Sequence, residues 1–287
     1  MTFELVSNNG ASAQLYLNAD WASIGNVSTN SAEASKELLA AAAKVALAKG
    51  YKQLIAPLNG DTWHSYRTIT FNSGEAKFFL EPDSPLSSNV LEDSGFELLA
   101  QYSSSKIDLA ASQKAISAVI AKRQETINKS FTVRPFNSNN FESELKVIFD
   151  LSLLSFKNNF LYQKITFADF AELYKPLSGL IKDDLVWLAF SGSQLVGLLF
   201  ALPDQYNPQQ IILKTVAVHP DYNGLGLASY LLACVHTEAV RLGFNYSVQA
   251  LYKDENKSAN LTSGHSTKLI RSYGLFALNL AATGTLQ

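Results

Sequence analysis

Hydrophobic residues recur along this chain at two spacings, one typical of helices and one of strands. Residues 30–49 hold good helix formers, with Asn30 placed to cap the first turn and Gly50 just past the last one, so they predict the clearest helix of the first half. A shorter helical stretch covers 86–94. Apolar runs bounded by turn residues predict strands at 52–57, 65–71, 76–82 and 96–103. A hairpin turn is predicted between the strands 65–71 and 76–82.

A second series of helices opens the other half of the chain. Residues 110–129 place apolar side chains near helical spacing among polar ones and predict a connecting helix. Another helix begins at Asn139 or Asn140, after a short strand. A third helix over 167–174 stops before Pro176, because the residue that precedes a proline disfavours helical geometry.

Strands dominate the remainder of the chain. Three apolar runs separated by turn residues predict an antiparallel meander, at 185–190, 195–202 and 211–218. From Leu227 to Leu242 the apolar positions return to helical spacing, with Gly243 as the stop. A polar loop and a short helix then lie between two further strands, at 245–252 and 273–280.

The two halves show a weak similarity in the order of their elements. A helix, a strand, an Asn-containing turn, a short helix and a strand follow one another in both. A chain of 287 residues is also long enough for two domains that each bury a core. We therefore predict an α/β protein with one domain at 1–128 and a related one at 129–287.

Composition and charge narrow the possible partners. Charged residues make up 17% of the chain and the net charge is −2, without any run of lysine or arginine, which argues against nucleic acid or an anionic membrane as partner. The single cysteine, Cys234, lies in an apolar helical pattern, which favours a buried structural thiol over a catalytic one and indicates no metal or disulfide. No signal-peptide pattern or apolar span of membrane length is present, so we expect a cytoplasmic protein.

The stretch HPDYNGLGLASYLL, residues 219–232, is the strongest candidate for chemistry. Gly224, Gly226 and Ala228 alternate with large apolar residues where a predicted strand passes into a helix. The first N–H groups of a helix lack partners within the helix and carry part of its positive dipole, so such a turn can hold a pyrophosphate if its side chains are small. A tight turn that uses glycine only to relieve steric conflict explains the same residues.

A dinucleotide-binding turn of the Rossmann type is a poor match to this stretch. That pattern requires a glycine or alanine where Ser229 stands, and an acidic residue about 20 positions further on, where 244–248 offers none. The strands before the turn are also predicted to be antiparallel, unlike those of a Rossmann sheet.

Residues 211–232 resemble motif A of the GNAT family of N-acetyltransferases, in which a Val-x-Val strand leads through a proline turn into Arg/Gln-x-x-Gly-x-Gly/Ala. Here Asn223 stands at the Arg/Gln position, while Gly226 and Ala228 match the two small positions. The element order over 131–280 is also that of the family. The resemblance implies tandem GNAT-like domains, each a mixed, mostly antiparallel sheet flanked by helices. The first has lost its cofactor signature, since its corresponding turn holds only Gly25.

The resemblance further implies an enzyme that moves an acetyl or other short acyl group from acetyl-coenzyme A to an amine, without a metal. The acceptor is a small-molecule or peptide amine, and both substrates bind before direct attack. By this resemblance Asn256 contacts the pantetheine arm. The remaining residues implied in coenzyme A binding are Val216, Ala217, Val218, Asn223, Gly224, Leu225, Gly226, Leu227 and Ala228.

The proton-transfer groups are less clear than the cofactor site. The tyrosine that often serves the family as general acid is replaced by Ser263, and Tyr252 and Tyr273 are the nearest phenols that could take its place. Asp254 and Glu255 follow the strand beside the expected cofactor arm and are candidates to accept a proton from the amine, although a solvated loop explains them as well. The missing tyrosine keeps a second hypothesis open, a non-catalytic sensor of acyl-coenzyme A.

Other polar residues admit plainer explanations. His219 could be a base but is expected to cap a turn, and His236 is expected to be structural or on the surface. The segment DTWHSYR at 61–67 concentrates polar and aromatic side chains. We interpret it as an exposed hairpin arm, with a wall of the acceptor pocket as the alternative.

Overall fold

The computed structural model describes residues 2–281, and these fall into two compact units. The first unit holds the chain up to Gly74, Pro82–Ser103 and the segment from Arg271 onward. The second holds Glu75–Glu81 and Ser104–Ile270. The division runs through two strands, β6 (Glu97–Asp108) and β12 (Thr267–Asn279), so that one end of each strand belongs to the first unit and the other end to the second. No helix in the described part of the chain is long and apolar enough to cross a membrane.

The first unit is a mixed sheet with α1 (Ala32–Ala48) against it. Its strand order is β1-β2-β3-β4-β12, with β6 beside β12 and β5 also paired to β12. The parallel pair is β3–β4, while β1–β2, β2–β3 and β4–β12 are antiparallel. The further elements are β1 (Phe3–Asn8), β2 (Ala11–Leu17), β3 (Ala22–Ser28), β4 (Gln53–Ala56), β5 (Thr68–Asn72) and α2 (Ser88–Asp93).

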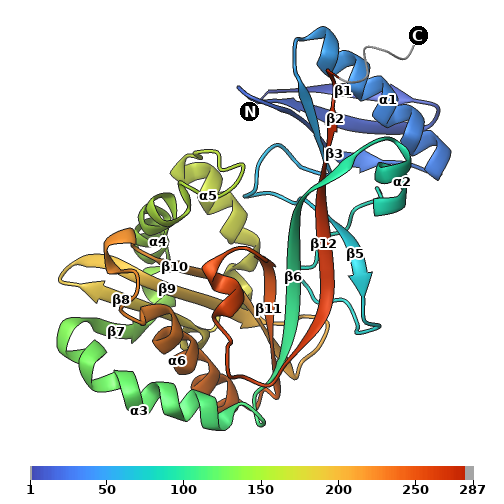
Figure 1. Cartoon of the computed structure of the whole chain (residues 1–287). Coiled ribbons are helices and arrows are strands. Elements are labelled where there is room, and N and C mark those ends of the chain that lie inside the picture. Colours follow the sequence, from blue (N-terminus) through green and yellow to red (C-terminus); the bar gives the residue numbers. More distant parts are fainter. Residues whose placement is uncertain (1, 282–287) are drawn as a thin grey trace. The chain divides into compact units, whose positions relative to one another are not determined.

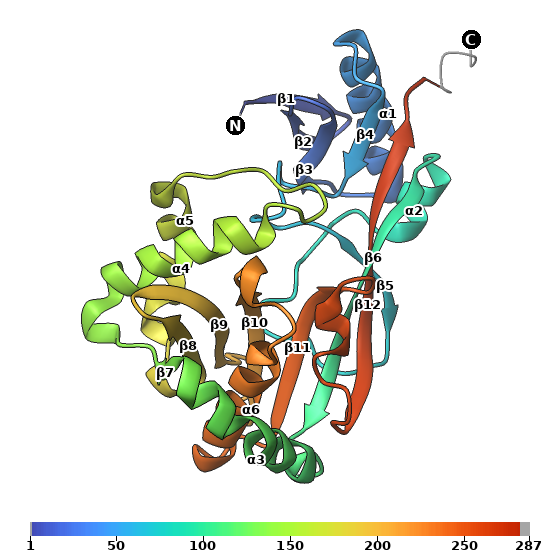
Figure 2. The ribbon, with the colours of Figure 1, turned by 60° about the vertical axis from the view of Figure 1, so that its left-hand side comes forward.

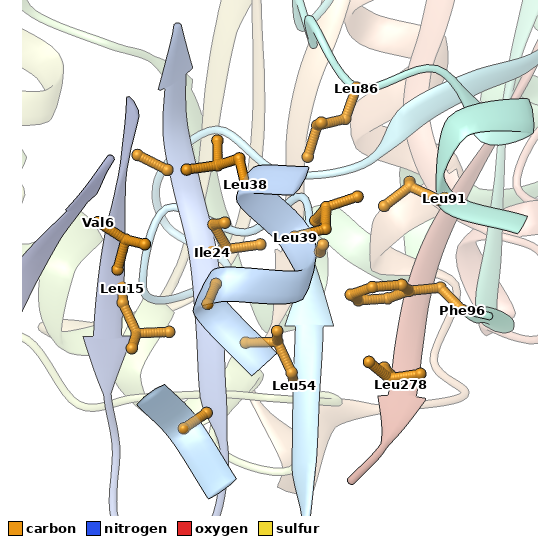
Figure 3. Packing of buried hydrophobic residues seen from close by; sticks show 14 of the residues in the cluster. Val6, Leu15, Ile24, Leu38, Leu39, Leu54, Leu86, Leu91, Phe96 and Leu278 are labelled. Carbon is orange, nitrogen blue, oxygen red and sulfur yellow. The ribbon is translucent and has the colours of Figure 1, made fainter. Parts of the chain in front are cut away.

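The core of the first unit lies between α1 and the sheet (Figure 3). Leu38 and Leu39 of the helix are almost fully buried against Leu15 and Ile24 of the strands. The N-cap is one residue later than the sequence predicts, because Ser31 rather than Asn30 accepts a hydrogen bond from the N–H of Ala34, and the helix begins at Ala32.

The second unit contains a larger sheet in the order β6-β11-β10-β9-β8-β7. Strands β7, β8, β9 and β10 are joined antiparallel, which confirms the predicted meander, and β10–β11 is parallel. The elements are α3 (Gln113–Ser130), β7 (Thr132–Pro135), α4 (Phe141–Phe156), α5 (Phe167–Tyr174), β8 (Val186–Ser191), β9 (Gln194–Pro203), β10 (Gln210–Val218), α6 (Leu227–Arg241) and β11 (Tyr246–Lys253).

Helices α3 and α6 lie side by side in both ribbon views (Figures 1 and 2). Ile116 and Ile127 of α3 are buried in the same apolar cluster as Leu231 and Val235 of α6. Because α3 completes this core, it belongs to the second unit. The predicted domain boundary at 128/129 therefore differs from the division into compact units, which places 104–128 with the second unit and the end of β12 with the first.

The two units repeat one order of elements. In the first, an antiparallel meander β1-β2-β3 leads through α1 to β4, which pairs parallel with β3. In the second, the meander β8-β9-β10 leads through α6 to β11, which pairs parallel with β10. A parallel pair requires a crossover, and in both units a helix supplies it.

Two predicted elements differ from the structure. Residues 76–82 form no strand, because Phe78 is buried with Ile212 and Val248 and the N–H of Phe79 donates to Oδ1 of Asp204. The apolar side chain of Phe78 is therefore buried without its backbone joining a sheet. The helix expected after β11 is a single short 3-10 turn, Lys257–Asn260.

A buried histidine makes the stability of the second unit depend on pH. His236 of α6 is fully buried, with Nε2 3.0 Å from the hydroxyl of Ser247 and its ring 5.3 Å from that of His265. Burial, and secondarily the neighbouring His265, lowers the pKa of His236 from 6.5 to about 3. This placement confirms a structural role for His236.

We predict that the free energy of unfolding falls as the pH is lowered from 6.5 toward 3. In this window the unfolded chain binds a proton that folded His236 does not, which costs up to about 1.4 kcal/mol per pH unit. Denaturant titrations at pH 7.5 and 5 should show a smaller loss for His236→Gln, whose amide can still bond to Ser247. An equal loss in both proteins would contradict the prediction.

Candidate functional site

Strands β10 and β11 separate part of the way along their length, which creates a fork in the sheet of the second unit (Figure 2). Their registered pairs run from Gln210 opposite Tyr246 to Leu213 opposite Gln249, although β10 continues to Val218 and β11 to Lys253. The register of β10 against β9 also shifts between Leu213 and Thr215, which makes Lys214 the extra residue of a β-bulge. A bulge bends its strand, so it accounts for the separation at this point.

Beyond the bulge, the N–H and C=O groups of every second residue of β10 point toward the fork. Val218 lies opposite Gly197 of β9, yet its carbonyl accepts a hydrogen bond from the hydroxyl of Ser155 at 3.1 Å, while the next N–H, that of His219, donates to β9. Antiparallel ladders alternate in this way, so the N–H and C=O groups of Val216 also face away from β9. An extended acyl-bearing chain in the fork could therefore bond to Val216 and Val218.

The loop after β10 leads to the start of α6, and two of its residues are glycines with positive φ. Gly224 and Gly226 have φ of +84° and +82°, a region that other residues rarely adopt. Gly226 is the N-cap of α6 and provides no side-chain hydrogen bond to the first turn. The N–H groups of that turn thus keep their capacity for a ligand.

The predicted cofactor residues around this loop differ in exposure. Leu227 is buried in the core beneath the helix, and Ala217 is buried within the sheet, so both support the site without offering a side chain to it. Asn256 is exposed and precedes the short turn that follows β11. Three others are exposed on the loop itself, namely Asn223, Gly224 and Leu225.

The segment that carries Asn256 is fastened to the fork by Gln249. The side-chain amide of Gln249 donates to the carbonyl of Ser258 and accepts from the hydroxyl of Thr262. Gln249 is the last residue of β11 that pairs with β10. Asn256 therefore lies in a loop that Gln249 holds at the point where β10 and β11 divide.

The first unit has the same parallel pair but closes its fork with its own chain. Registered pairing of β3 with β4 ends at Ser23 and Ile55, and the following loop then bonds to β3. The N–H of Leu58 donates to the carbonyl of Ile24 at 2.9 Å, and Oδ1 of Asn59 accepts from the N–H of Asn26 at 2.9 Å.

Gly25 serves this closed arrangement rather than a ligand. A Cβ at Gly25 would lie 2.7 Å from the carbonyl oxygen of Leu58, so glycine permits the close approach of the loop. The N-terminus of α1 is also capped by the side chain of Ser31. The strand edge beyond the parallel pair and the N–H groups at the helix start could hold coenzyme A in the second unit. In the first unit, the protein itself hydrogen-bonds to both.

The four candidates for proton transfer lie in different surroundings. Tyr252 is half-buried at the end of β11, with its hydroxyl 2.9 Å from that of Ser105. Asp254 is exposed in the turn that follows. Glu255 is exposed, and hydrogen bonding to Lys253 lowers its pKa, which makes it a weaker base. Tyr273 is fully buried in the part of β12 that belongs to the first unit.

Lys214, the bulged residue of β10, was missed by the sequence analysis. Its Nζ lies 3.2 Å from the hydroxyl of Tyr174 on α5 and 4.4 Å from the centre of that ring. The backbone of Lys214 lies where the strands divide, while its ammonium contacts α5. The only signal in the sequence was a charged residue inside an otherwise apolar strand, which a bulge explains once the register is known.

Other flagged residues have structural roles. His219 caps the 3-10 turn Pro220–Tyr222, accepting from the N–H of Asp221 at 3.3 Å, as expected. In the first unit, Asp61 is fully buried rather than part of an exposed arm, and its Oδ1 lies 2.7 Å from Nδ1 of His64. Arg67 is also buried, between the rings of Tyr66 and Tyr102. The exposed-arm interpretation of 61–67 therefore holds only for its tip, His64 and Ser65, which are exposed, and not for its two ends, which are buried.

Cys234 is buried in α6, and burial raises the pKa of its thiol to about 11. Because thiolate is the reactive form, we predict that the thiol of the native protein does not react with a disulfide reagent at pH 8 within the time in which the unfolded protein reacts completely. A colorimetric thiol assay with and without denaturant measures both rates. Comparable rates would show that Cys234 is accessible and activated.

Comparisons with known proteins bear on the family and the fold. Residues 151–262 match the model of the acetyltransferase (GNAT) family. A GCN5-related N-acetyltransferase from Sphaerobacter thermophilus resembles 94% of this chain over 77% of its own, at 12% identity and a TM-score of 0.56. A tandem GNAT protein from the clavulanic acid biosynthesis pathway matches 94% of this chain over 79% of its own, at 11% identity and a TM-score of 0.56.

A third structure places the likeness inside a much longer protein. It is the glucosamine N-acetyltransferase region of a fungal multi-domain β-N-acetylglucosaminidase, with 12% identity and a TM-score of 0.55. The match covers 93% of this chain but only 31% of that one. A search of curated proteins finds no match. The structural likenesses confirm the predicted tandem GNAT fold.

Proposed function

Residues 151–262 match the acetyltransferase (GNAT) family, and on that premise we propose that the chain transfers an acetyl or other short acyl group from acetyl-coenzyme A to an amine. The observation that carries the proposal is the fork between β10 and β11, which ends at a helix start without a side-chain cap. The acceptor is a small-molecule or peptide amine.

The fork and the loop fit the two chemical parts of coenzyme A. The pantetheine arm is an extended chain with amide groups, and the backbone of Val216 and Val218 offers it the hydrogen bonds of a strand edge. The pyrophosphate is a dianion, and the first turn of α6 offers N–H groups and the positive end of a dipole. Gly226 and Ala228 themselves add nothing larger than a methyl group to this turn.

The proposed reaction requires little from the protein beyond placement and polarisation. The amine nitrogen attacks the thioester carbon, so that a C–N bond forms and the C–S bond breaks. The thiolate leaves with the electron pair, and the amine loses a proton. A backbone N–H of Val216 or Val218 that is directed at the carbonyl oxygen stabilises the negative charge that develops there.

We predict that Ala228→Glu abolishes most coenzyme A binding in the full chain. A carboxylate in the first turn of α6 suits the helix dipole and should allow folding, but it repels the pyrophosphate. Like charges in contact cost several kcal/mol, so calorimetry should show a loss of about a hundredfold or more. The matched control is Ala32→Glu in the first turn of α1, which should leave the affinity unchanged. If both variants bind like the unmodified protein, the site lies elsewhere.

The rival hypothesis is a non-catalytic sensor of acyl-coenzyme A, which is favoured by Ser263 at the position of the family's usual tyrosine. A measurement of turnover separates the two hypotheses. Free thiol released from acetyl-coenzyme A across a panel of amines measures turnover directly. Release above the rate without amine supports the transferase. Binding with no release for any amine would favour the sensor.

We predict that the rate climbs from about pH 6 to 9 without a falling limb, because a lysine-type amine with a pKa near 10.4 must lose a proton, whereas a thiolate with a pKa near 8.5 leaves unaided. Tyr252→Phe removes only the hydroxyl that pairs with Ser105. A positioned general acid contributes roughly a hundredfold or more. A loss of that size, with acetyl-coenzyme A affinity kept, would overturn this prediction and identify Tyr252 as the acid.

A further inference from the structure

Arg123 lies against the glycine loop although it is far from it in sequence. It comes from α3, which packs beside α6 (Figure 1), and its Nη1 lies 3.4 Å from the carbonyl oxygen of Leu225. A Cβ at Gly226 would be 1.9 Å from Nη1 and 2.2 Å from Cζ of Arg123. The guanidinium therefore rests directly on the backbone at the start of α6.

The charge of Arg123 is not neutralised by the protein around it. Among residues 2–281, no carboxylate forms an ion pair with Arg123, whereas Lys129 on the same helix pairs with Glu125 at 2.6 Å. A guanidinium carries five N–H donors in a planar fork, and the long contact with Leu225 engages one of them weakly. The remaining donors suit the oxygens of a phosphate.

We propose that Arg123 binds the pyrophosphate of coenzyme A and takes the place of the Arg or Gln that Asn223 replaces. The inference rests on the proposed function, since it assumes a diphosphate at the start of α6. A cation that reaches the loop from a separate helix adds a charge-assisted contact to the backbone donors. Arg123 also lies outside the matched family segment, so this contact belongs to the chain rather than to the motif.

Gly226 then has two functions. Its positive φ turns the chain into α6, and its missing Cβ leaves the space that the guanidinium fills. Any side chain at 226 would displace Arg123 as well as crowd the phosphate. For this reason Ala228, rather than Gly226, is the position at which to introduce a carboxylate.

The test measures the affinity of the full-length protein for three probes, coenzyme A, dephospho-coenzyme A and pantetheine. Arg123→Met keeps much of the side-chain length and removes the charge. We expect it to weaken both phosphorylated probes alike, by about tenfold to a hundredfold, because charge-assisted hydrogen bonds have been lost. Pantetheine, which carries no phosphate, should bind as before. Lys122→Met removes an exposed charge from the adjacent position of α3 and should change none of the three affinities.

Other outcomes overturn the inference. A loss for coenzyme A but not for dephospho-coenzyme A would assign the contact to the 3′-phosphate. A loss that includes pantetheine would show that Arg123 supports the packing of α3 against α6 rather than binding phosphate. An unchanged affinity for all probes would show that Arg123 is not part of the site. If Arg123→Met does not fold, Arg123→Lys, which keeps the charge but not the fork, should lose less than Arg123→Gln. Failure of the unmodified protein to bind coenzyme A would instead refute the proposed function.

Discussion

Beyond Leu213 and Gln249, the two parallel strands of the second unit no longer hydrogen-bond to each other, and the candidate site depends on that separation. A strand edge inside a protein requires partners for its N–H and C=O groups. On the β10 side of the fork, the hydroxyl of Ser155 bonds to the carbonyl of Val218, and an extended ligand can take the groups that remain. The bulge at Lys214 allows β10 to leave β11 while it keeps its pairing with β9.

The first unit shows the other way to satisfy the same edge. There the loop that follows β4 bonds back to β3 through the N–H of Leu58 and the side chain of Asn59. Gly25 lets that loop approach, and Ser31 caps the helix that follows. The two units thus share a crossover topology but differ beyond the parallel pair: in the first the following loop bonds back to β3, whereas in the second the carbonyl of Val218 bonds to Ser155.

Residues outside the family segment contact the candidate site of the second unit. Helix α3 brings Arg123 to the loop, and Ser104 and Ser105 of β6 bond to the N–H of Leu251 and the hydroxyl of Tyr252. Ser104, Ser105 and Arg123 all precede residue 151, where the match to the family begins. A fragment that starts at 129 would lack them, so the whole chain is the appropriate object for binding and turnover experiments.

The sequence by itself determined the elements that local chemistry specifies. Apolar spacing and Pro176 gave α5 the predicted bounds 167–174, and the small residues at 226 and 228 located the start of α6. What depended on partners distant in the chain was decided only by the tertiary structure. Residues 76–82 have the apolar pattern of a strand, yet Phe78 is buried against Ile212 and no strand forms. Neither the closure of the first fork nor the approach of Arg123 to Gly226 leaves a local pattern, because each arises when distant segments pack together.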